Sequence, residues 1–399
     1  MTVGGFTRIA HVIDYFQPAL GYQETFLARN QIDRGNVVRV ITSDRYAPIL
    51  YVGHSSQGIL GNRIKGPGTF IEQGIEVVRL NTHLEFLNNL ILTGLEQSLM
   101  EFRPDAIHVH GVSSITAVRV AMLKRKMGAT RVLFDDHMTY NAIRGKWVLP
   151  FYTIFRVFFG RTILKNADEI VAVTEETRDF MKSKYGFPYD RIRIIPLGCD
   201  TTRFHRDEAK GRELRELYGI ASEDTVFCYI GKIISDKGVD LLIRASIELM
   251  KRGFNLKILG VGGKDPEYFS LIKNEIASSG LESRFIFLPP VPNRNLYEYY
   301  SMADVGIWPK QCSITSLEAM ACGIPVIISD KSGATERVSD NKNGFLYDEG
   351  NINDLEEKMT RLLARELRTI MGEEARRAAE VLDWGTISEK FEELYSSGE

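Results

Sequence analysis

Residues 226–238 read Val-Phe-Cys-Tyr-Ile-Gly-Lys-Ile-Ile-Ser-Asp-Lys-Gly. A run of apolar residues without alternation is typical of a parallel strand that is covered on both faces. The glycine that follows it and the helical pattern after Gly238 predict a strand, a tight loop and a helix. Lys232 and Lys237 lie in that loop, at the carboxyl end of the strand, where two cations can meet one diphosphate.

A second stretch, residues 313–325, reads Ser-Ile-Thr-Ser-Leu-Glu-Ala-Met-Ala-Cys-Gly-Ile-Pro and extends the predicted anion site. We expect a helix to begin near Ser313–Ser316, so that its first backbone N–H groups face the same anion. Glu318 follows one turn later and can accept hydrogen bonds from the hydroxyls of a ribose. Together the two stretches describe a site for a nucleotide-diphosphate sugar.

The composition places the chain among ordinary globular proteins. A length of 399 residues favours two domains, and a net charge of −2 argues against a dedicated nucleic-acid binder. The four cysteines form no CxxC pair and read as reduced, buried thiols. No secretory signal is visible at the N-terminus, and the longest apolar stretch is shorter than the ~18 residues that a membrane span needs.

Strand-like and helical segments alternate along almost the whole chain. The first series of expected strands is Arg8–Ile13, Val37–Thr42, Ile75–Arg79, Ala106–His110, Arg131–Asp135, Glu169–Val173 and Arg193–Ile195. The second series is Val226–Ile230, Asn255–Gly260, Phe285–Leu288, Val305–Trp308, Pro325–Ser329 and Phe345–Tyr347. Two successive βα series predict an α/β protein with two Rossmann-like, doubly wound domains that face each other across a cleft.

Residues 196–200, Pro-Leu-Gly-Cys-Asp, mark the expected boundary between the domains. We therefore expect an N-terminal domain over residues 1–197 and a C-terminal domain over 198–384, which contains the predicted nucleotide-sugar site. The helical patterns that bear on this division are Gln23–Arg34, Leu87–Phe102, Ile352–Arg365, Leu367–Val381 and Ile387–Tyr395. The last of them needs burial for Phe391, Leu394 and Tyr395, and we expect residues 385–399 to pack on the N-terminal domain.

Several short motifs in order resemble one known family. They are Gly-Tyr-Gln-Glu at 21–24, Asp-Ala-Ile-His-Val-His-Gly at 105–111, Ala-Asp-Glu-Ile-Val at 167–171, Pro-Leu-Gly-Cys-Asp at 196–200, the 231–238 loop and Glu-Ala-Met-Ala-Cys-Gly at 318–323. The chain is similar over nearly its full length to the retaining family 4 glycosyltransferases, which have the GT-B fold.

The resemblance implies a reaction and a set of site residues. It implies transfer of a sugar to an acceptor hydroxyl with retention of anomeric configuration, without a metal or another cofactor. The donor residues that it implies are Gly231, Lys232, Lys237, Val291, Ile314, Thr315, Ser316 and Glu318. The absence of any Asp-x-Asp pair in the chain agrees with the expectation of no metal.

The N-terminal domain carries the remaining site residues. His137 follows the fifth expected strand, matches the family histidine near the reacting sugar, and is grouped with Lys232 and Lys237 as catalytic. Gly21, Tyr22 and Gln23 form a glycine loop that faces the acceptor, and His110 has a similar placement. We expect His108 to point to the other face of its strand and to be structural.

The chain departs from the family at two lysines. Lys232 stands where the family has an arginine, which keeps the charge but loses the two-pronged fork. Lys310 stands where the family has the glutamate that contacts the donor sugar. Either the charge of Lys310 assists the departing diphosphate or pairs with an acidic sugar such as a uronic acid, or Lys310 points to solvent and Gln311 contacts the sugar.

Residues 144–165 mix six aromatic side chains with basic ones, including Arg144, Lys146 and Trp147. They indicate either a packed helix or a surface that contacts a membrane, which leaves a cytoplasmic enzyme with a peripheral membrane contact as one alternative. The expected partners are a nucleotide sugar and a saccharide or lipid-linked acceptor, and no nucleic acid. A nonhydrolysing nucleotide-sugar epimerase and a catalytically weak binding subunit remain the rival functions.

Overall fold

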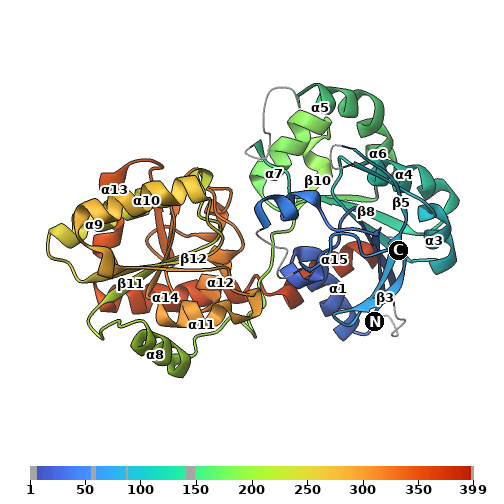
Figure 1. Cartoon of the computed structure of the whole chain (residues 1–399). Coiled ribbons are helices and arrows are strands. Elements are labelled where there is room, and N and C mark those ends of the chain that lie inside the picture. Colours follow the sequence, from blue (N-terminus) through green and yellow to red (C-terminus); the bar gives the residue numbers. More distant parts are fainter. Residues whose placement is uncertain (1–6, 55–59, 87–88, 141–148, 397–399) are drawn as a thin grey trace. The chain divides into compact units, whose positions relative to one another are not determined.

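A computed structural model describes residues 7–54, 60–86, 89–140 and 149–396. The chain divides into two compact units (Figure 1). The first comprises Met1–Leu197 and Trp384–Glu399, and the second comprises Gly198–Asp383. Each unit is built on its own parallel sheet, and this pattern is the α/β, doubly wound architecture that the sequence predicts.

The sheet of the first unit has eight strands in the order β10-β9-β8-β7-β1-β2-β4-β3. Their bounds are β1 Arg8–Ile13, β2 Val37–Ser43, β3 Gly68–Glu72, β4 Ile75–Leu80, β7 Ala106–His110, β8 Arg131–Asp136, β9 Glu169–Ala172 and β10 Ile192–Ile194. Only β3, at one edge, runs antiparallel, and the sequence pattern did not predict it. The parallel strands end at a common edge, which the Gly21 turn, Asp14, His110 and Asp135 share.

The helices of the first unit include one from the far end of the chain. They are α1 Gln23–Asp33, α3 Leu95–Phe102, α4 Ile115–Leu123, α5 Leu149–Phe155, α6 Arg161–Asn166, α7 Glu175–Phe180 and α15 Trp384–Ser396. Helix α15 lies beside α1, where Trp384 stacks on Phe26 with ring centroids 5.4 Å apart. Burial of Ile387, Phe391 and Leu394 explains why this last helix returns to the first unit.

The helix expected over Leu87–Phe102 is wrong in its first half. Strands β5 Thr82–Phe86 and β6 Asn89–Leu92 form an antiparallel pair, and α3 starts only at Leu95. In β6 the side chains alternate, with Leu90 and Leu92 fully buried, which is the period of a strand rather than a helix. Gly94, with φ 83°, is the left-handed residue that separates the hairpin from the helix.

The second unit has a six-stranded parallel sheet in the order β13-β12-β11-β14-β15-β16. The strands are β11 Thr225–Ile230, β12 Leu256–Val261, β13 Phe285–Leu288, β14 Val305–Trp308, β15 Val326–Ser329 and β16 Gly344–Tyr347. The helices are α8 Glu208–Leu217, α9 Val239–Lys251, α10 Pro266–Ser279, α11 Leu296–Met302, α12 Thr315–Ala321, α13 Ile352–Arg361 and α14 Arg365–Glu380. Helices α9, α10 and α13 cover one face of the sheet, and α8, α11, α12 and α14 cover the other (Figure 1).

Candidate active site

The loop after β11 depends on two glycines that meet backbone to backbone. Gly231 has φ 153° and donates its N–H to the carbonyl of Val261 at 3.0 Å. A Cβ on Gly262 would lie 1.9 Å from the carbonyl oxygen of Gly231, so no other residue fits there. Gly262, which follows β12, therefore supports the loop that follows β11.

Lys237 is the better positioned of the two lysines in this loop. It ends the short 3₁₀ turn η9, Ser235–Lys237, and its Nζ donates to the carbonyl of Gln311 at 3.3 Å. Its half-burial lowers the pKa of the ammonium, and the neighbouring charge of Lys232 lowers it further. Lys232 is exposed, and its backbone carbonyl is held by the hydroxyl of Tyr229 at 2.8 Å.

Lys310 lies against the same loop. A Cβ on Gly238, which has φ 66°, would come 2.8 Å from Cγ of Lys310, so the lysine stem packs over this glycine. The reading in which Lys310 simply points to solvent is therefore incomplete, because its stem is half-buried on the loop that carries Lys237. The contact that Gln311 makes here is through its backbone carbonyl.

Glu318 is a buried carboxyl at the second element of the site. It is 4% exposed, accepts a hydrogen bond from Nδ2 of Asn293 at 2.7 Å and lies 3.4 Å from the hydroxyl of Tyr300. Burial raises the pKa of Glu318 to about 7, and these two hydrogen bonds hold it from rising further. Val291 lies on the segment just before Asn293 and is half-buried against the core.

The turn before α12 is braced by a residue that the sequence reasoning missed. Nη1 of Arg337 donates to the carbonyl of Ser313 at 2.9 Å and to Oγ of Ser316 at 3.3 Å. Burial lowers the pKa of this guanidinium. The side chains of Ser313 and Thr315 are hydrogen-bonded to each other at 2.8 Å, and Ile314 precedes the helix as its N-cap. Helix α12 has seven residues, so the expected diphosphate site depends on the lysines and glycines of the loop after β11 and not on a helix dipole.

In the first unit, the expected glycine loop lies where the sequence places it. Gly21 has φ 68° and ends the 3₁₀ turn η1, Pro18–Leu20. Tyr22 precedes α1 as its N-cap and is 44% exposed. Gln23 is buried and donates from Nε2 to Oδ2 of Asp135 at 2.9 Å, which fixes the start of α1 against the end of β8.

His137 and His110 lie close to the same carboxylate. Nδ1 of His110 is 2.9 Å from Oδ2 of Asp135, and Nε2 of His137 is 3.9 Å from that oxygen. The backbone N–H of His137 donates to Asp136 at 2.7 Å, which orients the residue. Burial lowers the pKa of His137, but the carboxylates of Asp135, Asp136 and Glu24 outweigh it and raise the pKa above its ordinary value. The structure therefore places Gln23, His110 and His137 around the carboxyl group of Asp135.

The expected orientation of His108 is wrong. His108 and His110 are stacked with ring centroids 4.2 Å apart, and both reach Oδ2 of Asp135. Residues two apart in a strand point to the same face, so the two histidines share one side of β7. His108 is fully buried and belongs to the same polar cluster as His110.

Three histidines of this cluster come close enough to one another to consider a metal ion. Each of His11, His108 and His110 offers a ring nitrogen within 4.8 Å of the others. These nitrogens are already engaged in hydrogen bonds with each other, with Gln31, with Tyr395 and with Asp135. We therefore assign no metal to them.

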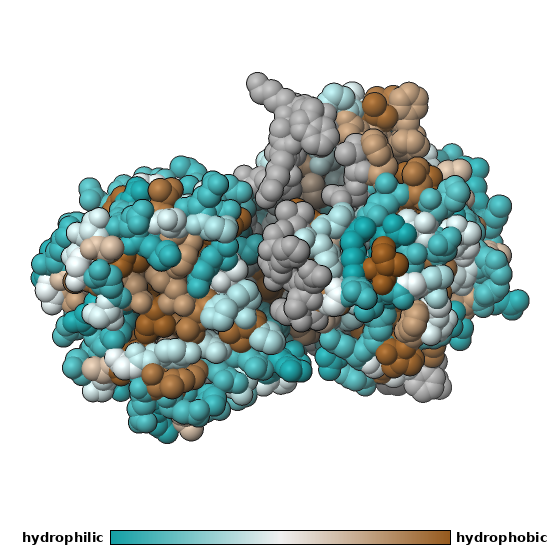
Figure 2. Space-filling model, viewed as in Figure 1, coloured by the Kyte–Doolittle hydropathy of each residue, from teal (hydrophilic) through white to brown (hydrophobic). Residues whose placement is uncertain are grey.

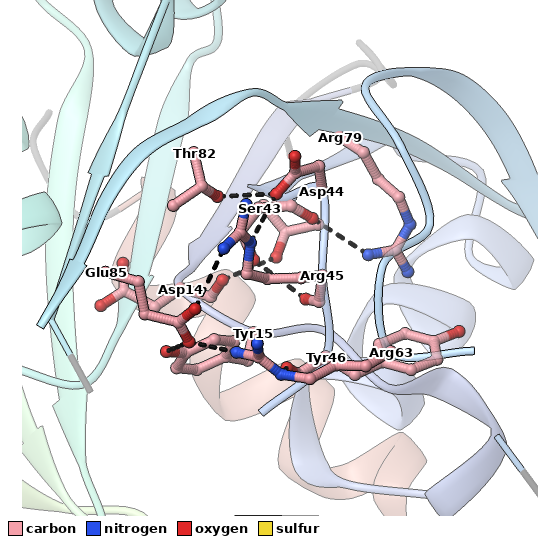
Figure 3. Close-up of polar contacts among 11 residues, drawn as sticks. Asp14, Tyr15, Ser43, Asp44, Arg45, Tyr46, Arg63, Arg79, Thr82 and Glu85 are labelled. Atoms are coloured by element: carbon pink, nitrogen blue, oxygen red, sulfur yellow. Dashed lines mark hydrogen bonds and ion pairs between the residues drawn. The ribbon is translucent and has the colours of Figure 1, made fainter. Parts of the chain in front are cut away.

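A second polar cluster at the carboxyl edge of β1, β2 and β4 was not singled out from the sequence (Figure 3). Tyr15 donates to Glu85 at 2.7 Å, and Arg63 forms an ion pair with the same carboxylate. Arg45 bridges Asp44 at 2.8 Å and Glu85 at 3.0 Å. The signal that was available is positional, because Asp14 and Asp44 directly follow strands.

Unlike Asp44 and Glu85, Asp14 has no cationic partner among the residues that the structure describes. The hydroxyl of Thr116 donates to its carboxyl group. Burial raises the pKa of Asp14 to about 7, and the hydrogen bond from Thr116 lowers it in part. A carboxyl that changes charge near neutral pH at the edge of the sheet is suited to accept a hydrogen bond from a ligand hydroxyl.

Two family models match the chain. The model described as "Glycosyltransferase Family 4" matches residues 25–203, and the model described as "Glycosyl transferases group 1" matches residues 211–378. The first match lies in the first unit and part of the boundary, and the second lies within the second unit.

Related sequences carry the names of glycosyltransferases. The GDP-mannose-dependent alpha-(1-6)-phosphatidylinositol monomannoside mannosyltransferase of Mycolicibacterium smegmatis is 31% identical over 286 residues, which are 69% of this chain and 72% of that protein. The D-inositol 3-phosphate glycosyltransferase of Nocardia farcinica is 32% identical over 249 residues, 59% of this chain and 54% of that protein. The chain thus spans only about half the length of the latter relative.

Solved structures share the fold over nearly the full length. A glycosyltransferase from Rickettsia africae has a TM-score of 0.75 at 18% identity, with 98% of each chain covered. HepE of Anabaena, solved in complex with UDP, also has a TM-score of 0.75, at 17% identity, and covers 98% of this chain and 100% of its own. From the two family models and the mannosyltransferase relative it follows that this chain belongs to family 4 of the glycosyltransferases and is an enzyme of that class with the GT-B fold.

Proposed function

We propose that the chain transfers a sugar from a nucleotide-diphosphate sugar to a hydroxyl group of a glycan, lipid-linked or small-molecule acceptor, with retention of anomeric configuration. The observation that supports this most is the convergence of Lys237, Lys310 and the Gly231 turn on the carboxyl edge of the second sheet. Glu318, on the next element of the same edge, supplies the acceptor for ribose hydroxyls.

The lysines have the largest role in the proposed reaction, because they stabilise the departing diphosphate. In the transfer, the bond between the anomeric carbon and the diphosphate breaks, a bond to the acceptor oxygen forms, and the acceptor proton passes to the departing diphosphate. Negative charge on the diphosphate grows as its bond to the sugar breaks. Fixed ammonium groups therefore stabilise the transition state more than they stabilise the ground state. Lys237 is suited to the task because it is held against Gln311 and half-buried before the donor arrives.

The acceptor side of the proposal rests on unpaired acceptor atoms in the first unit. Among the described residues, Oε1 of Gln23 and Oδ1 of Asp135 are buried without a hydrogen-bond partner. Buried acceptors favour a partner that donates, and the hydroxyls of a sugar or polyol supply such donors. The named relatives act on phosphatidylinositol monomannoside or inositol 3-phosphate, which are polyols of this chemistry.

We also propose that the first unit contacts a membrane surface that holds a lipid-linked acceptor. No helix among the described residues is both long enough and apolar enough to cross a bilayer. Ile154, Val157 and Phe158, on α5 and the π-helical turn Arg156–Gly160, are exposed by 52%, 61% and 67%. Figure 2 shows hydrophobic surface over the region where Figure 1 places α5. Arg144, Lys146 and Trp147 of the expected membrane face lie outside the described residues.

Sedimentation with vesicles that contain an anionic phospholipid tests this contact. We expect Val157→Glu and Phe158→Glu together to abolish sedimentation, because membrane binding would bury two carboxylates in the apolar part of the bilayer interface. Ile370→Glu is the matched control, since Ile370 is 61% exposed on α14 of the second unit. Equal sedimentation of all three proteins would remove this face from the proposal.

Lys310 bears on which sugar the donor carries. Its ammonium donates hydrogen bonds but accepts none, so next to the donor it favours a sugar with a carboxylate over a neutral one. The proposal here is that Lys310→Glu shifts preference away from a uronic-acid donor toward its neutral counterpart. An unchanged ratio of the two rates would show that Lys310 does not contact the sugar.

A donor screen by mass spectrometry tests the proposed function as a whole. We expect one nucleotide sugar, with GDP-mannose first in the panel, to yield an acceptor heavier by one sugar residue and an equal amount of nucleoside diphosphate. Conversion of a nucleotide sugar to its epimer without an acceptor would instead identify the epimerase. Donor binding without turnover on any acceptor would identify a binding subunit.

A further inference from the structure

Six side chains of the first unit form a closed ring of hydrogen bonds, which we call the proton ring. In order they are Asp135, His110, His11, Gln31, Tyr395 and His108, and the last returns to Asp135. The successive distances are 2.9, 2.9, 2.7, 3.2, 2.8 and 3.0 Å. They come from β1, β7, β8, α1 and α15, and each side chain is nearly or fully enclosed.

A count of protons shows that the proton ring does not close with neutral histidines. Each of the six hydrogen bonds needs one proton between its two heavy atoms. The three histidines, if neutral, supply one each, the Gln31 amide supplies one to the ring and the Tyr395 hydroxyl supplies one. An ionised Asp135 supplies none, so five protons serve six bonds. The ring therefore holds one proton more than three neutral imidazoles and a carboxylate contain.

The geometry locates the bond that lacks its proton. The oxygen of Gln31 faces Nε2 of His11, so His11 uses its own proton there. His110 uses its proton toward Asp135. Nδ1 of His11 and Nε2 of His110 would then meet at 2.9 Å as two lone pairs, which repel each other. The extra proton belongs between these two nitrogens.

The surroundings favour His110 as its owner. Burial, followed by the charge of His110 and then of His108, lowers the pKa of His11 well below its ordinary value. Burial and the charge of His110 likewise lower the pKa of His108 to about 4. The ionisable groups that interact with this part of the ring are the carboxyls of Glu24 on α1 and of Asp135 on β8, and the imidazole of His137. Of the two histidines that share the extra proton, His110 also hydrogen-bonds the Asp135 carboxyl group at 2.9 Å, whereas His11 bonds the amide of Gln31.

We propose that the proton ring holds His110 as an imidazolium at neutral pH, and that Asp135 and Tyr395 are the positioning residues that keep it so. Tyr395 reaches the ring from α15, so the last helix sets the charge of a residue at the acceptor edge. Asp135 also holds Gln23 of the glycine loop, which ties the loop to the same ring. The proton count stands without the proposed function, and only its effect on transfer rests on that function.

Long-range ¹H–¹⁵N correlation spectra of the full chain with labelled histidine test the proposal directly. Substitution of one ring histidine at a time assigns the signals. At pH 7 we expect both nitrogens of His110 to carry protons, and His11 and His108 to be neutral with the proton on Nε2. Three neutral imidazoles, or an imidazolium at His11 or His108, would overturn the proposal. An imidazolium at His108 would mean that the Gln31 amide is turned the other way.

Tyr395→Phe supplies the decisive comparison, because it opens the ring while keeping the size of the side chain. The four bonds that remain can be served by four protons, from Gln31, His11, His110 and His108, so no extra proton is needed. We expect His110 to become neutral at pH 7 and His11 to move its proton from Nε2 to Nδ1, as the Gln31 amide rotates. Tyr46→Phe, at a buried tyrosine outside the ring, is the control and leaves the histidine signals unchanged. A His110 imidazolium that persists in folded Tyr395→Phe contradicts the proposal.

A kinetic measurement separates positioning from a merely structural role. We expect Tyr395→Phe to raise the KM for the acceptor ~5-fold, about the worth of one neutral hydrogen bond, and to leave donor affinity at the wild-type value. Equal loss of donor affinity would indicate general destabilisation and would overturn the positioning role. The spectra need no turnover, so failure of the proposed transferase function leaves the test of the proton ring intact.

Discussion

Lys237 is the residue on which the proposed donor site depends most. It follows a strand, a glycine turn and a 3₁₀ turn, and its ammonium is held at 3.3 Å from the Gln311 carbonyl. Lys232 is close enough to lower the pKa of Lys237, and the stem of Lys310 lies on Gly238. The site thus gathers positive charge that the free protein tolerates only at some electrostatic cost, as expected where an anion binds.

Lys237→Ala is expected to reduce kcat/KM for transfer ~10- to 150-fold, the effect of losing a charge-assisted hydrogen bond worth ~1.5–3 kcal/mol. Steady-state kinetics with saturating acceptor measures this. Lys251→Ala is the control, since Lys251 is an exposed lysine of the same unit that pairs with Glu248. Wild-type kcat/KM in a folded Lys237→Ala protein would refute the role given to this lysine.

Glu318 makes the free protein sensitive to pH. Because burial raises the pKa of its carboxyl from 4.5 to about 7, the folded state holds a proton that the unfolded chain has already released. The free energy of unfolding is therefore highest, with respect to this carboxyl, below pH 4.5, and it falls as the pH rises from 4.5 through 7. A shift of this size corresponds to at most ~3 kcal/mol.

Glu318→Gln removes this titration, so we expect the variant to be ~1–3 kcal/mol more stable than the wild type at pH 8 and to show little difference at pH 5. Urea unfolding at the two pH values measures it. The same variant should bind the donor more weakly, because a ribose loses a carboxylate acceptor. A stability difference that is the same at both pH values would contradict the raised pKa.

At the scale of elements, helix α15 joins the two ends of the chain in one unit. Phe391 is fully buried and lies 4.8 Å from the ring of His108, and Arg34 of the α1 end pairs with Glu389 and Glu392. The buried aromatic contact contributes more than the exposed ion pairs, whose usual worth is under ~1 kcal/mol.

Phe391→Ala is expected to destabilise the first unit by ~3–5 kcal/mol, the usual cost of removing a buried phenyl ring. Hydrogen exchange should show faster exchange in β7 and β8 and unchanged exchange in the second sheet. Glu393→Ala, on the exposed side of the same helix, is the control, with an effect within ~0.5 kcal/mol. Loss of protection in β11 and β12 instead would mean that the helix stabilises the other unit.

Elements with continuous apolar runs were predictable, and those that depend on pairing were not. Strands β1, β7, β13 and β14 match the sequence prediction at both ends, and apolar residues make up most of each strand. Strand β3 has four exposed residues and forms only because β4 offers it an edge. Strand β6 lies within the stretch expected as a helix, Leu87–Phe102, because so short an apolar run does not distinguish a strand from a helix.

The residues of the site also divide into those that the sequence predicts and those that it does not. Lys232, Lys237, Glu318 and His137 follow strand or motif boundaries that are visible in the sequence. Arg337 and Tyr395 do not, since each reaches its partners from a distant segment, as Tyr395 does to His108 across 287 positions. Contacts of this kind become visible only when the sheet and the returning helix are in place.

At the scale of the whole molecule, two similar units divide the proposed work. The second unit supplies ammonium groups and a buried carboxyl, and the first supplies imidazoles and hydrogen-bond acceptors. Cations for the diphosphate and acceptors for hydroxyls are complementary to the two substrates of a sugar transfer. This complementarity is the physical content of the proposed function.

Transfer is expected to persist in excess EDTA. The chain has no Asp-x-Asp pair to hold a diphosphate-bound metal, and lysines stand at the predicted phosphate position. Initial rates with EDTA, and with Mg²⁺ or Mn²⁺ added back in excess, measure the dependence. Activity that disappears with EDTA and returns with either ion would contradict the lysine-based site.

The central claim is that the loop from Gly231 to Gly238 binds the diphosphate of the donor. Isothermal titration of the wild type and of the Lys232→Ala, Lys237→Ala double variant with UDP and GDP tests it most directly. We predict that the wild type binds one of these diphosphates and that the double variant loses at least ~100-fold in affinity, as the removal of two charge-assisted contacts implies. Equal affinities in two equally folded proteins would contradict the claim.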